Sequence, residues 1–196
     1  FCGYNRYRAV ELAEKTDHWP QFMKYIMGWN LWQRIPSPTN QRSIIRRGKR
    51  FLAAVSKSRE ERYLNWISIF NDDIRCQMWT DEFKNSLQQH QAKEWIVSAY
   101  QKCSARDFLT LTTCVDVHTY LPFDILKKVD IASMAYSLEC RSPFMDHEVV
   151  ELAARMPMKL KMNSRQQKKI LLDTFGKYLP PRLQSRSKMG FGVPIN

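Results

Sequence analysis

Apolar residues recur at helical spacing through most of this chain, and proline follows several of these segments. In residues 147–156 they fall three or four positions apart, which places them on one side of a helix, and Pro157 follows. No stretch alternates apolar and polar residues for long enough to predict a strand. The same spacing predicts helices over residues 6–16, 20–30, 40–55, 59–70, 92–103, 106–120, 124–138, 147–156 and 166–178. We therefore expect a mainly α-helical chain.

The length of 196 residues suits one domain or most of one, and an apolar content of 44% is enough for a core. No apolar run has the roughly 20 residues that a membrane-spanning helix needs, so no membrane partner is expected. The chain starts at Phe1 without a Met or a signal-type segment, and we interpret it as the interior of a longer protein. The tryptophans and tyrosines of the first half of the chain are expected in the core; the tryptophans are Trp19, Trp29, Trp32, Trp66, Trp79 and Trp95.

The cysteines lie far apart, with no Cys-x-x-Cys pair and no Cys/His spacing typical of zinc sites. We expect free, mostly buried thiols in a protein of the reducing cytoplasm, and no metal site. The four histidines are equally scattered and are expected to be structural. The cysteines are Cys2, Cys76, Cys103, Cys114 and Cys140, and the histidines are His18, His90, His118 and His147.

The formal net charge is +12, but the basic residues are spread along the chain and only residues 46–50 form a tight cluster. This cluster is interpreted as a solvated helix face. No helix-turn-helix, RNA-binding or zinc-finger signature accompanies the charge, so no nucleic-acid partner is expected. Surplus positive charge would equally suit an enzyme that handles ATP and pyrophosphate.

Common catalytic motifs are absent from the sequence: it has no phosphate-binding P-loop, dinucleotide fingerprint, zinc-protease motif or nucleophile elbow. The C-terminal third instead places five charged residues among apolar neighbours. Buried charges are costly unless they are paired or bind a ligand. Both interpretations stay open here, a structural ion-pair network and a ligand site. The five residues are Lys128, Asp130, Glu139, Arg141 and Asp146.

These residues belong to segments that resemble the asparagine synthetases. The central signature of that family is similar to Tyr120-Leu-Pro, Lys128-Val-Asp130, Ser133-Met-Ala and Leu138-Glu-x-Arg-Ser-Pro-Phe-x-Asp146. Later family landmarks resemble Lys168-x-x-Leu-Leu, Leu179-Pro and Arg186-x-Lys-Met-Gly-Phe-Gly-Val-Pro194. The opening Phe1-Cys-Gly-Tyr-x-Arg-Tyr7 resembles the segment that follows the family's acidic loop. The landmarks come in the family's order over the full chain.

The resemblance implies a fold and an activity. Residues 1–196 would be the helical C-terminal part of a PP-loop, adenine-nucleotide-hydrolase-like α/β synthetase domain. The family uses Mg²⁺ and ATP to adenylate the side-chain carboxylate of aspartate, releasing pyrophosphate. Ammonia from glutamine, produced in a separate N-terminal domain, then displaces AMP. The glutaminase domain, the Ser-Gly-Gly-x-Asp-Ser loop and the acidic Mg²⁺ loop are absent from this sequence, so we expect the chain alone to be inactive. A cytoplasmic location follows from the resemblance, and a homodimer is left open.

The resemblance also assigns site residues. Lys168 matches the lysine that contacts pyrophosphate, whereas Lys169 should point elsewhere. Arg141 and Asp146 match fixed positions, and Arg141 could either brace the site through a carboxylate or touch a ligand.

Other positions carry alternatives. Lys128 and Asp130 lie two residues apart, so they should serve different partners. Glu139 would support the site, and Arg186 and Lys188 would form either a basic loop that closes over ATP or a simple turn. Phe123 and Ile131 depart from the family pattern.

Three other functions remain open at this point. One is amidation of another carboxylate by the same chemistry. The second is the adenylation chemistry of β-lactam-forming relatives. The third is a non-catalytic basic helical module that binds a partner or nucleic acid through its positive charge.

Overall fold

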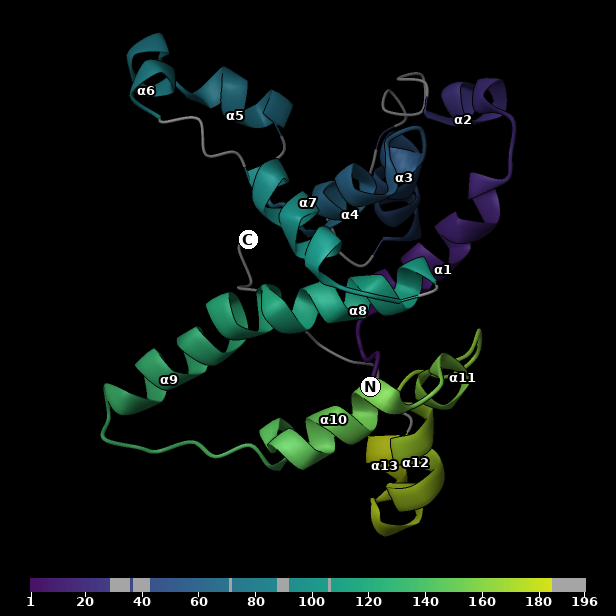
Figure 1. Ribbon diagram of the computed structural model, residues 1–196, viewed down its shortest axis with the longest axis vertical. Helices are drawn as coiled ribbons and strands as arrows, with labels where there is room; N and C mark the ends of the chain where they lie inside the picture. The colour runs from purple at the N-terminus through teal and green to yellow at the C-terminus, as the bar shows by residue number, and fades with distance from the viewer. Residues whose placement is uncertain (29–35, 37–42, 71, 88–91, 106, 185–196) are drawn as a thin grey trace. The chain divides into compact units, whose positions relative to one another are not determined.

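The computed structural model describes residues 1–28, 36, 43–70, 72–87, 92–105 and 107–184 (Figure 1). It divides into two compact units, Phe1–Arg8 with Ile125–Asn196, and Ala9–Asp124. The described residues are helical apart from turns and one isolated bridge, so the expectation of a mainly α chain is confirmed. None of the described helices has the length and apolar character to cross a membrane.

The helices of unit 2 (Ala9–Asp124) are α1 (Asn5–Asp17, shared with unit 1), α2 (Gln21–Gly28), α3 (Ile44–Val55), α4 (Arg59–Ile67), α5 (Asp72–Met78), α6 (Asp81–Ser86), α7 (Ala92–Lys102) and α8 (Phe108–His118). Neighbours in sequence pack together, α2 on α3, α3 on α4 and α7 on α8, and α7 also packs on α4. The sequence pattern missed α5 and α6.

Aromatic and small apolar residues form the core of unit 2. Tyr63 of α4 and Tyr100 of α7 meet edge to face with ring centres 6.4 Å apart, and Tyr100 stacks on Phe108 at 5.2 Å. The described tryptophans lie outside this core, since Trp19 and Trp95 are exposed and Trp66 and Trp79 are half-buried. The prediction of aromatic core residues is therefore confirmed for Tyr63 and Tyr100 and wrong for the described tryptophans. Trp29 and Trp32 lie outside the described residues. The other buried apolar residues of the unit are Val10, Ala13, Ala54, Val55, Ile96, Ala99, Leu109 and Val115.

The basic cluster of residues 46–50 lies on α3, with Arg46, Arg47 and Arg50 exposed. This confirms the prediction of a solvated helix face.

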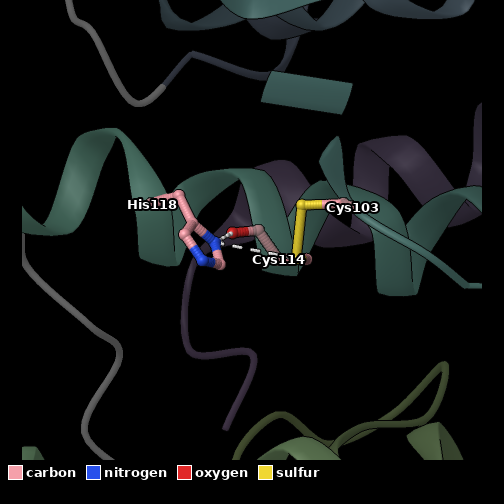
Figure 2. A group of neighbouring side chains, drawn as sticks. All are labelled: Cys103, Cys114 and His118. Carbon is pink, nitrogen blue, oxygen red and sulfur yellow. Dashed lines mark hydrogen bonds between the residues drawn. A yellow bond between two sulfur atoms is a disulfide. The ribbon is translucent and has the colours of Figure 1, made fainter. Parts of the chain in front are cut away.

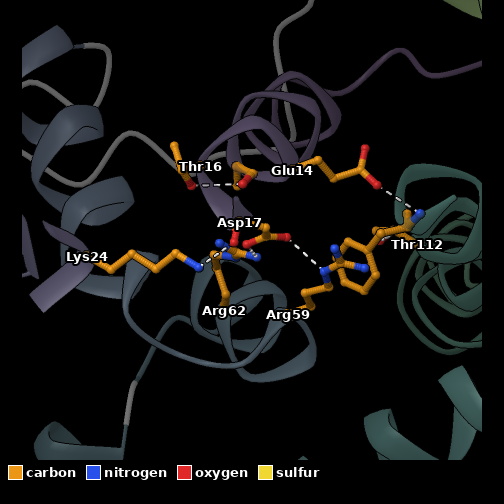
Figure 3. A network of polar contacts seen from close by, with 9 residues as sticks. Glu14, Thr16, Asp17, Lys24, Arg59, Arg62 and Thr112 are labelled. Atoms are coloured by element: carbon orange, nitrogen blue, oxygen red, sulfur yellow. Dashed lines mark hydrogen bonds and ion pairs between the residues drawn. The ribbon is translucent and has the colours of Figure 1, made fainter. Parts of the chain in front are cut away.

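A buried ion pair joins the end of α1 to α4 (Figure 3). One carboxylate oxygen of Asp17 accepts a hydrogen bond of 2.8 Å from Arg62, and the other accepts one of 2.8 Å from Arg59. The side chain of Arg62 is 2% exposed and that of Asp17 is 14% exposed. Burial by itself raises the pKa of Asp17, but the hydrogen bonds and charges of the two arginines outweigh it and lower that pKa below its ordinary value.

The helices of unit 1 (Phe1–Arg8 with Ile125–Asn196) are short. They are α9 (Lys127–Met134), the 3₁₀ turn η3 (Pro143–Met145), α10 (His147–Arg155), α11 (Met158–Lys161), α12 (Lys169–Phe175), the 3₁₀ turn η4 (Gly176–Tyr178) and α13 (Pro181–Gln184). A π-helical turn, η2 (Leu121–Leu126), runs into α9. Within the predicted segment 166–178, helical turns begin only at Lys169, because Gln167 pairs with Met162 in an antiparallel bridge.

Unit 1 exposes much apolar surface along α9 and the chain that follows it. Ile131 is 60% exposed, Tyr136 88% and Leu138 59%. Large exposed apolar groups in neighbouring positions are typical of surfaces that another segment covers.

We predict that Asp17→Asn lowers the free energy of unfolding by about 3 kcal/mol, because it leaves the buried Arg62 guanidinium without its carboxylate. Urea denaturation followed by circular dichroism measures this change. Asp81→Asn is the matched control, since the carboxylate of Asp81 is 93% exposed in its pair with Lys84 and its loss should change little. Equal effects of the two substitutions would contradict the prediction.

The same pair predicts a pH dependence. Because the folded-state pKa of Asp17 is lowered, its stabilisation is fully present above the ordinary value of 3.8 and is lost as the pH falls through the lower, folded-state pKa. The difference in unfolding free energy between the wild type and Asp17→Asn should therefore shrink in acid. A difference that stays constant down to the lowest pH at which the protein folds would contradict this assignment.

Candidate functional site

A tight hairpin over residues 162–167 precedes α12. Met162 and Gln167 form its antiparallel bridge. The side-chain oxygen of Asn163 accepts hydrogen bonds from the backbone N–H groups of Arg165, at 2.9 Å, and Gln166, at 2.7 Å. The N–H of Asn163 donates to the carbonyl oxygen of Gln166 at 2.9 Å. An Asn side chain that bonds to the backbone two or three residues on stabilises a turn, and this one fixes where α12 begins.

Residues 1–8 attach to this hairpin through two hydrogen bonds that are remote in sequence. The side-chain amide of Gln167 donates to the carbonyl oxygen of Tyr4 at 2.8 Å. The guanidinium of Arg8 donates to the carbonyl oxygen of Arg165 at 2.8 Å. The beginning of the chain and the hairpin are therefore held side by side within unit 1.

Apolar contacts extend the same attachment. The buried thiol of Cys2 lies 3.5 Å from the sulfur of Met158, the first residue of α11. The ring of Phe1 meets that of Phe144 edge to face, with centres 5.8 Å apart. Phe144 belongs to the signature segment of residues 138–146, so that segment and the hairpin both contact residues 1–4.

Lys168 leaves the hairpin in the left-handed conformation, with φ 52° and ψ 35°, directly before α12. A residue with a side chain adopts this region at a cost of about 1–2 kcal/mol. Its stem runs across Gly3, where an added Cβ would lie 2.7 Å from Cε of Lys168. Cys2, beside Gly3, also has a positive φ, of 49°. Two residues with left-handed backbone therefore lie next to Gly3, Cys2 in sequence and Lys168 in space. Because Gly3 has no side chain, the methylene chain of Lys168 can pass close to it. Backbone strain of this kind is typical of functional sites.

The remaining signature charges take local partners. Arg141 donates to Glu139 at 2.8 Å from Nε and at 3.3 Å from a terminal nitrogen. The Arg141 side chain is 85% exposed and that of Glu139 is 68% exposed, so the pair braces its own loop. Asp146 caps α10 by accepting a hydrogen bond of 2.9 Å from the N–H of Glu148.

Lys128 and Asp130 are both exposed on α9. Glu139, Arg141 and Asp146 are exposed as well, and only Arg141 and Glu139 among the five pair with each other in the contacts given above. The apolar neighbours in this segment are themselves at the surface, so there is no low-dielectric interior around the charges. Arg186 and Lys188 lie outside the described residues.

Lys169, by contrast, turns to its own helix and forms an ion pair with Asp173, four residues on. Its side chain is 31% exposed. Lys169 therefore points toward Asp173, whereas the side chain of Lys168 lies against Gly3. The two lysines point in different directions, as the spacing predicts.

The sequence analysis missed one cluster. Cys103, Cys114 and His118 come together in unit 2, and Cys103 and Cys114 form a disulfide (Figure 2). The expectation of free thiols is wrong for these two residues, because the packing of α7 on α8 brings their Cα atoms within 6.2 Å. Of the cysteines outside the disulfide, Cys2 is buried as predicted, whereas Cys76 and Cys140 are exposed. The available signal was the Cys-x-x-x-His spacing inside a predicted helix, which places both side chains on one face.

Comparison with known proteins gives a family and two relatives. The sequence model described as asparagine synthase matches residues 1–196. The glutamine-hydrolysing asparagine synthetase 1 of Bacillus subtilis (strain 168) is 28% identical over 195 residues, covering 100% of this chain and 29% of that protein. Amidase chry2 of Gibberella zeae is 20% identical over 217 residues, covering 99% of this chain and 30% of that protein. The chain thus spans less than a third of these relatives, and no solved structure matches it.

We predict that Asn163→Ala lowers the free energy of unfolding by about 1 kcal/mol or more, because two backbone N–H groups of the hairpin lose their acceptor. Asn163→Asp keeps an oxygen acceptor in the same place and should stay near the wild type. Urea denaturation of the three proteins distinguishes the cases. Equal losses in both variants would show that the Asn163 acceptor does not hold the hairpin.

Proposed function

The chain belongs to the asparagine synthase family, and on that premise we propose that it forms part of an ATP-dependent synthetase that converts L-aspartate to L-asparagine. Glutamine supplies the nitrogen through a glutaminase domain elsewhere in the full-length protein, and AMP and pyrophosphate are the other products. Because this chain corresponds to under a third of its relatives, the activity belongs to the whole protein. We assign it to the cytoplasm, where ATP and aspartate are supplied.

The observation that carries the proposal is the setting of Lys168. Its exposed side chain leaves a strained backbone position and crosses Gly3, beside the segment that follows the acidic loop in the family pattern. A strained residue persists only where its surroundings hold it, and here the hairpin and residues 1–4 do so. A lysine held in this way is suited to bind an anion at a fixed point.

The proposed chemistry has two balanced steps. A carboxylate oxygen of the aspartate side chain attacks the α-phosphorus of ATP, the bond to the β-phosphate oxygen breaks, and pyrophosphate leaves. Ammonia then attacks the acyl carbon, a proton goes to solvent, and AMP leaves with the bond's electron pair. Negative charge grows on the pyrophosphate oxygens during the first step. The ammonium of Lys168 would stabilise that charge more in the transition state than in bound ATP, which is what accelerates a reaction.

The other signature residues would support this site. Asp146 fixes the start of α10, and the Arg141–Glu139 pair shapes the loop that leads to Phe144, whose ring contacts Phe1. The guanidinium of Arg141 is 85% exposed and keeps donors for a phosphate or carboxylate. Lys128 and Asp130 would contact other parts of the synthetase domain, and Arg186 and Lys188, which lie outside the described residues, would supply positive charge near ATP.

Magnesium would be held mainly by other parts of the protein. Of the described acidic residues of the signature, Glu139 and Asp146 already accept hydrogen bonds from Arg141 and from the α10 backbone, and Asp130 is exposed on α9. Cationic groups such as Lys168 contact phosphate oxygens and do not ligate a metal ion. When bound, Mg²⁺ would neutralise charge on the phosphates of ATP.

A second candidate function differs only in the acceptor. One relative, which aligns with 99% of this chain, is named an amidase and not an asparagine synthetase. Because relatives carry different names, a panel of carboxylates should be tested beside aspartate. The adenylation step and the role of Lys168 are the same in both cases. A non-catalytic binding module would show no pyrophosphate release with any acceptor.

We predict that Lys168→Ala lowers aspartate-dependent pyrophosphate release about a hundredfold, which corresponds to about 2.7 kcal/mol of lost transition-state stabilisation. The assay uses the full-length protein with ATP, Mg²⁺, ammonium and aspartate. Lys169→Ala is the matched control, because it removes a neighbouring lysine that pairs with Asp173. The control should keep nearly full activity.

Each alternative outcome has a distinct meaning. If both variants match the wild type, the family assignment stands but the role of Lys168 is wrong. If aspartate gives no release and another carboxylate does, the acceptor is wrong and the adenylation step stands. If no carboxylate gives release, the proposed synthetase activity is wrong.

We also predict that Gly3→Ala lowers the same activity while it leaves the fold nearly unchanged. The added methyl would lie 2.7 Å from Cε of Lys168, which is too close. The methylene chain of Lys168 would therefore change its conformation, and the ammonium group would move with it. The free energy of unfolding should change by less than about 1 kcal/mol. Unchanged activity in a folded Gly3→Ala protein would show that the path of the stem over Gly3 does not matter.

A further inference from the structure

Cys103, Cys114 and His118 bring three metal-binding side chains to one place in unit 2, outside the proposed synthetase site (Figure 2). Cys103 follows the end of α7, while Cys114 and His118 lie one turn apart on α8. One ligand atom from each residue lies within 4.8 Å of the others. The two cysteines are half-buried and the histidine is exposed, so the cluster can be reached from solvent.

The donor set is the kind that zinc prefers. Two sulfurs and an imidazole nitrogen suit Zn²⁺, which binds thiolate at about 2.3 Å and imidazole at about 2.0–2.1 Å in tetrahedral geometry. Those bond lengths put a sulfur and a nitrogen of one zinc centre about 3.6 Å apart. In the structure, Sγ of Cys114 and Nδ1 of His118 are 3.7 Å apart. The helical spacing alone therefore sets this pair at the separation of two zinc ligands.

The rest of the unit holds the cluster in place. Asp107 caps α8 by accepting a hydrogen bond of 2.8 Å from the N–H of Thr110. The hydroxyl groups of Tyr100 on α7 and Thr112 on α8 are 2.9 Å apart, and Tyr100 stacks on Phe108. Tyr100 thus links α7 to α8 through contacts that do not involve the cysteines, and we expect Cys103 and Cys114 to stay adjacent when the disulfide opens.

We propose that the reduced pair of Cys103 and Cys114, together with His118, binds one Zn²⁺ ion, and that the disulfide is the metal-free alternative of the same site. Water would complete the coordination. Nδ1 of His118 also lies 2.9 Å from the carbonyl oxygen of Cys114. A nitrogen that binds zinc carries no proton, so Nδ1 gives up this hydrogen bond to the carbonyl when it ligates the metal, and Nε2 then carries the ring proton.

The exchange between the two forms is balanced. A dithiol reductant gives two electrons and two protons to the Cys103–Cys114 bond, which breaks into two thiols while the reductant becomes a cyclic disulfide. Zn²⁺ then displaces both thiol protons to solvent as the thiolates bind. Oxidation by the reverse exchange releases the metal. The site is therefore governed by the thiol–disulfide balance around the protein.

The experiment uses the full-length protein, reduced with a dithiol, freed of the reductant without air and titrated with Co²⁺ and then Zn²⁺. The thiol count in denaturant comes first, since the chain has five cysteines and three of them lie outside the disulfide in this structure. We expect this segment to contribute three thiols before reduction and five afterwards. Reduced protein should bind one Co²⁺ with a thiolate-to-cobalt charge-transfer band, which Zn²⁺ abolishes. Oxidised protein should show no such band.

Variants assign the ligands. Cys103→Ser and Cys114→Ser should each weaken or remove the charge-transfer band, and His118→Ala should weaken Co²⁺ binding at least about tenfold. Cys76→Ser is the matched control, because Cys76 is an exposed free thiol outside the cluster, and it should bind as the wild type does. Circular dichroism checks that each variant is folded.

Three results would overturn the proposal. The first is a thiol count that does not rise by two in the wild type on reduction. The second is reduced protein without the charge-transfer band. The third is a His118→Ala protein that binds Co²⁺ as tightly as the wild type. None of these results depends on synthetase activity, so the failure of this proposal and that of the proposed function can be told apart.

Discussion

The attachment of residues 1–8 to the hairpin of residues 162–167 is the constraint on which the candidate site depends. These segments are more than 150 positions apart in sequence, yet hydrogen bonds from Gln167 and Arg8 join them. Cys2 also contacts Met158, which precedes the hairpin. Without this attachment, no partner would lie beneath the stem of Lys168. The left-handed backbone at Lys168 would also lose the neighbours that hold it. A long-range contact thus turns one of two adjacent lysines into a candidate catalytic group.

The two units use polar residues in different ways. Unit 2 buries the Arg62 guanidinium against Asp17, so its charges link one helix to another. Unit 1 keeps its signature charges at the surface beside exposed apolar residues such as Ile131 and Tyr136. Charges at an apolar surface contribute little to stability, because solvent screens them. They suit a surface that meets further protein or substrate, as the C-terminal part of a larger synthetase domain would require.

Local patterns predicted the longer described helices, because the period of apolar residues is a local property, and missed the short helices α5, α6, α11 and α13. They failed where distant residues decide. The start of α12 at Lys169 follows from the pairing of Gln167 with Met162, which helical periodicity cannot reveal. The resemblance to a family singled out Lys168, but its left-handed conformation and its path over Gly3 depend on long-range packing. The disulfide was missed for the same reason, since the packing of α7 on α8 creates it.

The most direct test of the central claim is the reactivity of individual lysines in the full-length protein. An amine-labelling reagent with peptide mapping by mass spectrometry reports Lys168 and Lys169 separately, with and without Mg²⁺ and pyrophosphate. If Lys168 binds the departing pyrophosphate, the labelling of Lys168 falls sharply when pyrophosphate is added, while that of Lys169, which pairs with Asp173, stays the same. Labelling of Lys168 that pyrophosphate does not change, at concentrations that saturate the protein, would contradict the account.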